Sequence, residues 1–318
     1  MWSFILRRLI QAIPLLFIIT IISFLIINLA PGDPVYMFVN PDQVSQQDLA
    51  LIRLQLGLDK PLPLRYAIWL GNIMRGDLGN SFYYARPVSR VLMEALPNTL
   101  ILALCATIFS FAIAIPAGII SAMRRNTAFD YAFSTVSFIG VSLPSFWFGL
   151  LMILVFSLRL DWLPTSGMYS LSVQGYDFWD RVRHLVLPTL VLGMGTMASK
   201  MRYMRSAMLE VIRQDYVRTA KAKGLASRVV IGKHALRNAL LPVITLLGFI
   251  VPSLVGGAAI VETIFGWPGI GRIAVQAAFT RDYPLMMGNL LLSSTMVILG
   301  SLLADVLYAV ADPRIRYD

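Results

Sequence analysis

Long apolar runs alternate with short polar segments along most of the chain. A helix needs about 20 apolar residues to cross the core of a bilayer. Five runs reach that length: Leu9–Ala30, Asn98–Met123, Tyr131–Leu158, Leu240–Glu262 and Leu285–Val310. A sixth run, Leu185–Met204, is weaker because Lys200 and Arg202 interrupt its end, but long cationic side chains can reach the bilayer surface from a helix end. The pattern predicts an all-α polytopic membrane protein with six transmembrane helices.

Basic residues concentrate on one side of the six predicted spans. On that side, the N-terminus, the turn at 124–125, the segment 200–238 and the C-terminus hold two, two, ten and two Lys or Arg residues. The short opposite loops at 159–184 and 263–284 hold three and two. Because short cytoplasmic loops carry the excess of Lys and Arg, we expect both termini in the cytoplasm. The first run is too long for a signal peptide and is interpreted as a retained span.

This topology predicts three parts of the chain, with a cytoplasmic segment inside the third. They are an N-terminal transmembrane helix at 1–30, an extracytoplasmic loop or small helical cap at 31–97, and a five-helix core at 98–318 that contains the cytoplasmic segment 206–240. Prolines lie inside three predicted spans, where each removes a helix hydrogen bond: Pro116, Pro144 and Pro252. They favour a bundle that changes shape over a rigid anchor.

The composition agrees with a membrane location, since 57% of the residues are hydrophobic and 14% are charged, with a mean hydropathy of +0.71. We ascribe the net charge of +10 to cytoplasmic loops and not to nucleic-acid binding. A single cysteine, Cys105, excludes an internal disulfide, and His184 and His234 lack the spacing of a metal site. No G-x-x-x-x-G-K-[ST] loop occurs, and the glycines of "GMG" (193–195) are interpreted as packing positions.

A basic stretch at 216–244 lies between two apolar runs. Four residues recur at every fourth position and predict one face of a helix: Met208, Ile212, Tyr216 and Ala220. Gly224 is expected to end that helix in a left-handed conformation, and Ser227 to cap the next helix. The stretch therefore predicts a helical elbow with small residues at its apex. Two interpretations stay open: a basic amphipathic helix on anionic lipid headgroups, or insertion into a protein groove, which the small apex favours.

The same stretch resembles the cytoplasmic signature of permease subunits of ATP-binding-cassette (ABC) importers. In that family a Glu-Ala-Ala segment is followed by Gly and later by a Leu-Pro pair. Here the corresponding residues are Arg218, Thr219 and Ala220, then Gly224, then Leu241–Pro242. The arginine and the longer interval before the proline resemble the peptide/nickel permease class. Further motifs of that class follow in order along the chain: "APGDP", "LGLDKPLPLRYAIWLGNIMRGDLGNSF", "SLPSFWFG", "LDWLPTSG", "FGWPGIGR" and "ADVLYAVADPRIRY".

The resemblance implies the type I ABC importer permease fold and a transport subunit without enzymatic activity. The elbow would be a coupling helix resting in a groove of an ATPase subunit, through Tyr216, Arg218, Thr219, Ala220, Lys221, Ala222, Lys223 and Gly224. The implied partners are a second homologous permease in a heterodimer, two ABC ATPases that bind ATP and Mg, and an extracytoplasmic substrate-binding protein that delivers a peptide. No cofactor is expected in this chain.

Small polar side chains in two spans are candidates for a translocation path: Ser134, Ser137, Ser142, Asn289 and Ser293. Helix–helix hydrogen bonds are the alternative explanation for each. Asp305 and Asp312 lie on one face of the last predicted helix and are candidates for a structural ion pair or a gate, with the structural role favoured. Glu262, at the end of the fifth run, is expected to be solvated or paired with a loop arginine.

Other functions stay open at this point. Within the family, the substrate could be a dipeptide, a longer peptide, a glutathione-like peptide or a nickel chelate. A secondary transporter coupled to protons or sodium would need ionisable residues near the middle of its spans, and these are nearly absent. An intramembrane enzyme would need either a nucleophile with its base or a pair of aspartates in mid-span. The predicted spans contain neither arrangement.

Overall fold

The computed structural model describes residues 2–29, 35, 45–55, 57–173, 175–240 and 258–311, and these contain helices but no β-strand. The helices of the first half are α1 (Trp2–Leu29), α2 (Gln46–Gln55), α3 (Leu62–Met74), α4 (Val88–Met123), α5 (Ala128–Ser142), α6 (Ser145–Met152) and the π-helix η2 (Ile153–Arg159). Those of the second half are α7 (Phe178–Val211), α8 (Asp215–Ala222), α9 (Ser227–Val229), the π-helix η3 (Val230–Ala235), α10 (Leu236–Ala239), α13 (Ile270–Phe279) and α14 (Tyr283–Ala311). The predicted all-α class is confirmed.

The chain divides into two compact units. The first unit contains Met1–Asn98 and Pro268–Ile298, and the second contains Thr99–Trp267 and Leu299–Asp318. Helices α4 and α14 therefore contribute residues to both units. The predicted three-part division concerns position relative to the membrane, and it stays a prediction.

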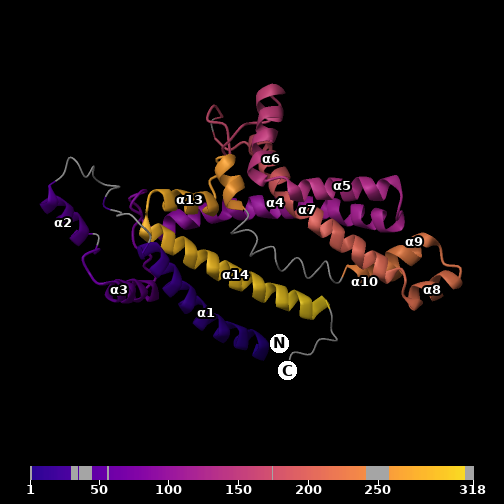
Figure 1. The fold of residues 1–318 in the computed structure, drawn as a ribbon, viewed down its shortest axis with the longest axis horizontal. Coiled ribbons are helices and arrows are strands. Elements are labelled where there is room, and N and C mark those ends of the chain that lie inside the picture. The colour runs from indigo at the N-terminus through magenta and orange to yellow at the C-terminus, as the bar shows by residue number, and fades with distance from the viewer. Residues whose placement is uncertain are drawn as a thin grey trace. The chain divides into compact units, whose positions relative to one another are not determined.

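In the first unit, one side of α1 packs against α3 and the start of α14, as Figure 1 shows. Phe24, Ile27 and Met287 are buried there, with Tyr66 and Trp69 of α3 against them. The apolar residues on the remaining surface of α1 are exposed, among them Ile10, Ile13, Ile18, Ile26 and Leu29. A helix that is apolar around its whole circumference is typical of a membrane span. We therefore interpret the exposed side as a lipid-facing surface.

Three described helical segments are long and apolar enough to cross a membrane: Ile5–Leu29, Val88–Met123 and Tyr283–Leu303. They correspond to the first, second and sixth predicted spans. The prediction of one continuous third helix over Tyr131–Leu158 is wrong. Helix α5 ends at Ser142 and α6 begins at Ser145, with a bend of 101° between them. Pro144 explains the break, because it lacks an N–H donor and forces the preceding Leu143 into an extended conformation.

The predicted fifth span, Leu240–Glu262, lies mostly outside the described residues, as does the Leu241–Pro242 pair. The described end of this run, residues 258–264, is helical. Glu262 is fully buried, and its Oε1 accepts a hydrogen bond from Thr99 Oγ1 at 2.7 Å. The expectation of a solvated Glu262 is therefore wrong, because a hydroxyl of α4 provides a donor inside the protein. The alternative, pairing with a loop arginine, stays a prediction.

In the second unit, glycines allow α4 and α7 to approach closely. A Cβ atom added to Gly118 of α4 would lie 2.7 Å from Met204 Cβ and 2.9 Å from the carbonyl oxygen of Met201. A Cβ on Gly193 of α7 would lie 2.6 Å from a ring carbon of Phe109, whereas one on Gly195 would meet nothing within 4 Å. The packing interpretation of the "GMG" glycines therefore holds for the first of them only.

This difference gives a matched pair of substitutions. We expect Gly118→Ala to lower the free energy of unfolding by about 1–3 kcal/mol, because the new methyl group overpacks a backbone contact. Gly195→Ala, in open space on α7, should raise it by up to about 1 kcal/mol through helix propensity. Unfolding of the purified chain in detergent, followed by circular dichroism, measures both values. Equal effects of the two substitutions would contradict the close packing of α4 on α7.

Candidate functional site

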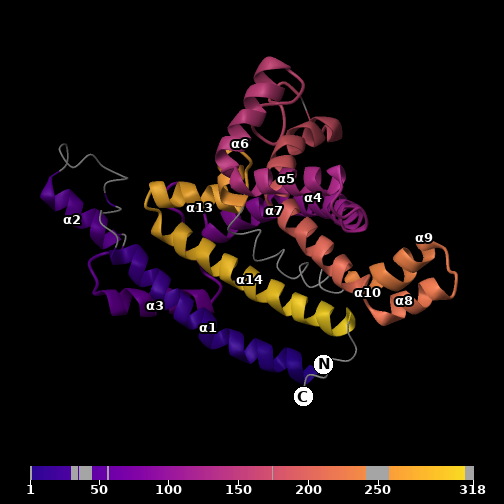
Figure 2. The same cartoon turned by 45° about the vertical axis from the view of Figure 1, so that its right-hand side comes forward.

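The basic stretch forms a helical elbow after the end of α7. Figure 2 shows α8 and α9 lying beside each other, joined by a tight connection, with α10 returning towards α7. Gly224 adopts φ +74° in that connection, as predicted for the left-handed conformation. The helix before it is not continuous, because α7 ends at Val211 and α8 begins at Asp215. The residue that caps α9 is Ala226 and not Ser227, which is already the first helical residue.

The break separates the residues that periodicity placed on one helical face. Met208 is buried in a cluster with Ala235 and Ala239, whereas Ala220 is buried in another with Val217 and Val230. Ala220, which was expected among the coupling residues, packs inside the elbow between its two arms and is not available on its surface. Helix breaks reset the angular position of later side chains, so a four-residue repeat across a break does not define a common face.

The remaining predicted coupling residues are exposed: Tyr216, Arg218, Thr219, Lys221, Ala222, Lys223 and Gly224. Tyr216 also fastens the two arms, because its hydroxyl accepts a hydrogen bond from Asn238 Nδ2 at 2.9 Å. A Cβ on Gly224 would meet nothing within 4 Å, so open space surrounds the turn. Among the predicted coupling residues, the small ones without a polar side chain that stay accessible are therefore Ala222 and Gly224.

The exposed surface of the elbow is strongly basic. Its exposed cations are Arg213, Arg218, Lys221, Lys223, Arg228, Lys233 and Arg237. Arg218 and Asp215 form an ion pair at 3.5 Å, but both side chains are largely exposed, so the pair contributes little to stability. The surface is suited to an acidic partner or to anionic lipid headgroups.

A buried ion pair supports the end of α7 just before the elbow. Arg205 donates from Nε to Asp130 Oδ1 and from Nη2 to Oδ2, both at 2.8 Å. Ser121 Oγ also donates to this carboxylate, and the N–H of Asn126 donates to Oδ2 at 3.0 Å. These contacts connect α7 with the turn between α4 and α5. Sequence reasoning missed the pair, because 75 positions separate its members and both looked like ordinary charges at span ends.

An apolar cluster continues this connection into the elbow. Ala122 of α4, Met204 and Met208 of α7, and Ala235 and Ala239 of the second arm are buried together. The elbow is therefore packed on α7 and α4 and is not an isolated appendage. A force applied to it would reach both helices through close-packed side chains, because packed interiors deform little.

The ammonium of Lys200, for which a position at the bilayer surface was expected, makes hydrogen bonds within the protein. Its Nζ donates to Ser110 Oγ at 3.0 Å and to Thr196 Oγ1 at 3.1 Å, and it lies 4.5 Å from the ring centroid of Phe111. The hydroxyls of Ser110 on α4 and Thr196 on α7 accept hydrogen bonds from the ammonium, and these replace hydrogen bonds to water. Long cationic side chains inside membrane helices are stabilised by such polar partners.

The candidate path residues make mostly local hydrogen bonds. In α5, Ser137 is buried and its hydroxyl lies 2.8 Å from Phe133 O and 3.2 Å from Met201 Sδ, while Ser142 bonds to Phe138 O at 2.8 Å. Ser134 is half-buried on the same helix. In the other unit, Asn289 Nδ2 lies 3.5 Å from Ile270 O and Ser293 Oγ lies 3.4 Å from Asn289 Oδ1. Their role in a path stays a prediction.

Only Asp305 of the two candidate gate residues is among the described residues. Asp305 is half-buried on α14, and Asp312 lies outside the described residues. Their pairing or gating role stays a prediction.

Comparisons with known proteins agree with the helical architecture. The model for the binding-protein-dependent transport system inner membrane component matches residues 114–317, and its N-terminal companion matches residues 1–103. An inward-facing structure of the MetNI methionine ABC transporter aligns with a TM-score of 0.53 at 19% identity, over 70% of this chain and 97% of that one. At that identity the likeness shows the fold, which is that of a type I ABC importer permease.

Curated relatives match over the whole length. The chain is 47% identical over 318 residues to the oligopeptide transport system permease protein AppB of Bacillus subtilis (strain 168), covering 100% of both chains. It is 44% identical over 334 aligned positions to the di/tripeptide transport system permease protein DppB of Pseudomonas aeruginosa (strain UCBPP-PA14), covering 100% of this chain and 99% of that one. The chain therefore belongs to the family of binding-protein-dependent transport system inner membrane components, and it is a multi-pass permease subunit of the bacterial inner membrane.

Proposed function

We propose that this chain is one of two paired permeases in an ABC importer that carries peptides into the cytoplasm. The observation that carries the proposal is the elbow, a basic and exposed helical turn with small residues at its connection, packed directly on two long helices. The peptide substrate is inferred from the names of the relatives, which are oligopeptide and di/tripeptide permeases.

The proposed topology has six spans with both termini in the cytoplasm. The bent pair α5–α6 would provide the third span, α7 the fourth, and the run at 240–262 the fifth. The exposed cations of the elbow support this orientation, because Lys and Arg accumulate on the cytoplasmic side. The segment 31–97 would then lie outside, where helix α3 has the apolar surface of an interfacial cap.

The proposed partners follow from the family and from the elbow. Two ATPase subunits would bind ATP and Mg, and the elbow would rest in a groove of one of them. A homologous second permease would complete the path, and an extracytoplasmic binding protein would deliver the peptide. No cofactor is proposed for this chain. The helices of the permease would have two alternative arrangements. Closure of the ATPases would shift the equilibrium towards the arrangement that the closed ATPases bind more tightly.

A secondary transporter is the second candidate, and Lys200 is the observation that favours it, since an ionisable group lies within α7. Its ammonium is held by two hydroxyls and faces an aromatic ring, which fits a structural role. We therefore retain the ABC importer as the main proposal.

Uptake into proteoliposomes separates the two candidates. The chain is reconstituted with its paired permease and ATPases, the binding protein is added outside, and a labelled tripeptide is supplied. We expect uptake only with ATP enclosed, and none from a proton or sodium gradient alone. Undiminished uptake without ATP would show a secondary transporter. Labelled nickel chelate and glutathione, offered in the same assay, test the other substrates of this class.

A further inference from the structure

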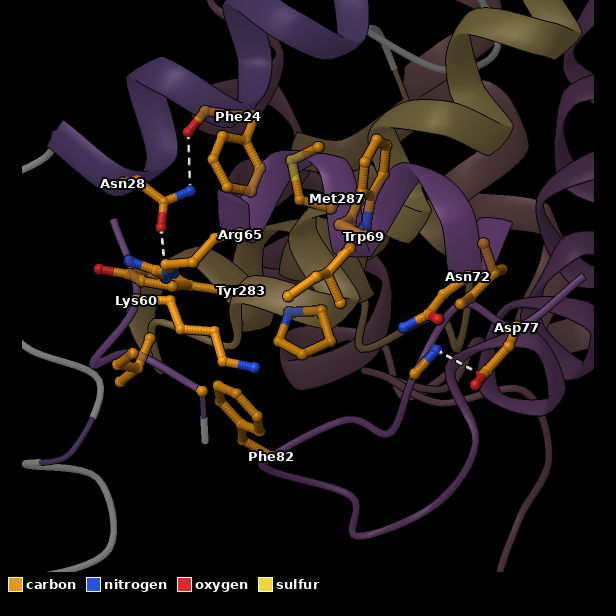
Figure 3. Close-up of a pocket in the computed structure, with 16 residues that line it drawn as sticks. Phe24, Asn28, Lys60, Arg65, Trp69, Asn72, Asp77, Phe82, Tyr283 and Met287 are labelled. Atoms are coloured by element: carbon orange, nitrogen blue, oxygen red, sulfur yellow. Dashed lines mark hydrogen bonds between the residues drawn. The ribbon is translucent and has the colours of Figure 1, made fainter. Parts of the chain in front are cut away.

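A cavity of about 250 Å³ lies in the first unit, between the end of α1, one side of α3 and the start of α14 (Figure 3). Two basic side chains, Lys60 and Arg65, line it together with four aromatic residues: Phe24, Trp69, Phe82 and Tyr283. Nothing in the transport mechanism above uses this pocket. Cations beside aromatic and aliphatic walls are suited to an amphipathic anion.

Arg65 is held in place by the end of the first span. Its Nη2 donates to Asn28 Oδ1 at 2.6 Å, and Asn28 Nδ2 in turn donates to the carbonyl oxygen of Phe24 at 2.8 Å. Figure 3 shows this chain of bonds along one wall of the pocket. A guanidinium carries five N–H donors, so the Asn28 bond leaves several of them for a ligand. Burial lowers the pKa of Arg65, and Tyr283 and Asp59 offset this only in part.

Lys60 supplies a second positive charge. Within the described part of the chain, its ammonium makes no hydrogen bond or ion pair, and Figure 3 shows the side chain extending into the pocket towards Phe82. The pocket also contains one carboxylate, Asp77, which accepts a hydrogen bond from the N–H of Gly79 at 2.8 Å. In Figure 3 Asp77 lies at the other end of the pocket from Arg65. The end near Arg65 and Lys60 therefore carries two positive charges against the one negative charge of the nearby Asp59.

The surroundings of the pocket are apolar and open. Next to the buried Phe24, the residues Leu25, Ile26 and Leu29 of α1 are 42–68% exposed. On α3, Ile68 lines the pocket and is exposed, and Leu64 is exposed one turn earlier. Aromatic side chains such as Trp69 and Tyr283 favour the level of the headgroups in a bilayer. The pocket thus combines a cationic end with apolar surface on a span and an amphipathic helix.

We propose that this pocket binds the headgroup of an anionic phospholipid, with Lys60 and Arg65 on the phosphate and the acyl chains along the exposed side of α1. Arginine matches a phosphate with paired N–H donors, and lysine adds a point charge. In the proposed topology the lipid belongs to the outer leaflet, because Asn28 ends the first span. A free phosphate would use the cations but leave the apolar surface uncovered.

Retention of lipid by the purified chain tests the proposal. The intact chain is reconstituted in vesicles of equal phosphatidylglycerol and phosphatidylethanolamine, extracted with mild detergent and measured by native mass spectrometry. We expect retained phosphatidylglycerol to exceed phosphatidylethanolamine by about tenfold, because both lipids carry the phosphate but the ammonium of phosphatidylethanolamine is repelled by the two cations. Lys60→Ala should remove most of this preference. The exposed side chain of Lys60 has no partner among the described residues, so the substitution leaves the fold intact.

Arg75→Ala is the matched control, because Arg75 is an exposed cation just after α3 that does not line the pocket. It should retain the wild-type preference. Equal retention of both lipids by the wild type, or equal losses in the two variants, would overturn the proposal. Displacement of the lipid by inorganic phosphate alone would indicate a simple anion site, and displacement by a tripeptide a substrate site. The measurement involves no transport, so its failure leaves the proposed function untouched.

Discussion

Asp130→Ala is expected to lower the free energy of unfolding by about 3 kcal/mol and to reduce transport. The substitution leaves the guanidinium of Arg205 without its two carboxylate bonds, and removing one partner of a buried pair costs about 3–5 kcal/mol. The lower end applies because the Arg205 side chain is 26% exposed and stays partly hydrated, whereas that of Asp130 is 5% exposed. Unfolding in detergent and peptide uptake measure the two effects.

Asp215→Ala provides the control for this substitution. Asp215 also pairs with an arginine, Arg218, but both side chains are largely exposed, so its loss should change stability by less than about 1 kcal/mol. Arg205→Lys keeps the charge but loses the paired donors, so it should be intermediate. If Asp130→Ala and Asp215→Ala have equal effects, the buried pair does not hold α7 to the α4–α5 turn.

The helical class and most long helices followed from the sequence, because uninterrupted apolar runs have few alternatives in a membrane. The runs at 9–30, 98–123 and 285–310 correspond to α1, the later part of α4, and α14. The break in the third predicted span did not follow, although Pro144 was noted inside it, because sequence alone does not distinguish a bent helix from two helices. Helix α7 was found, but its cations Lys200 and Arg205 also have partners on α4 and α5, which the sequence does not reveal.

At the elbow, too, the sequence predicted local features but not contacts between helices. Gly224 was identified correctly, since a helix end with a left-handed residue has a local cause that the sequence carries. The burial of Ala220 depends on Val230 of the second arm, and the ion pair of Arg205 depends on Asp130 of another helix. Contacts of this kind are set by tertiary packing, which one-dimensional periodicity does not contain.

Ala222→Trp is expected to abolish ATP-dependent uptake while the chain stays inserted in the membrane. Ala222 ends α8 and is exposed beside the open space around Gly224, so an indole there would hold a partner surface several ångströms away. Earlier in α8, Ala220→Trp is the poorer test, because that residue is buried against Val217 and Val230 and the substitution would disrupt the elbow itself. Co-purification with the ATPase subunits and peptide uptake are measured together.

Ala128→Trp makes the same change at the exposed alanine that begins α5, on the same proposed side of the membrane but outside the elbow. It should leave ATPase binding and uptake near the wild-type values, because a bulky side chain outside the elbow does not meet the proposed ATPase contact. The lipid interpretation of the elbow predicts the opposite for Ala222→Trp, since tryptophan favours the bilayer interface and would strengthen the contact with headgroups. Normal ATPase binding and uptake in Ala222→Trp would therefore assign the basic elbow to the membrane surface and remove it from the coupling mechanism.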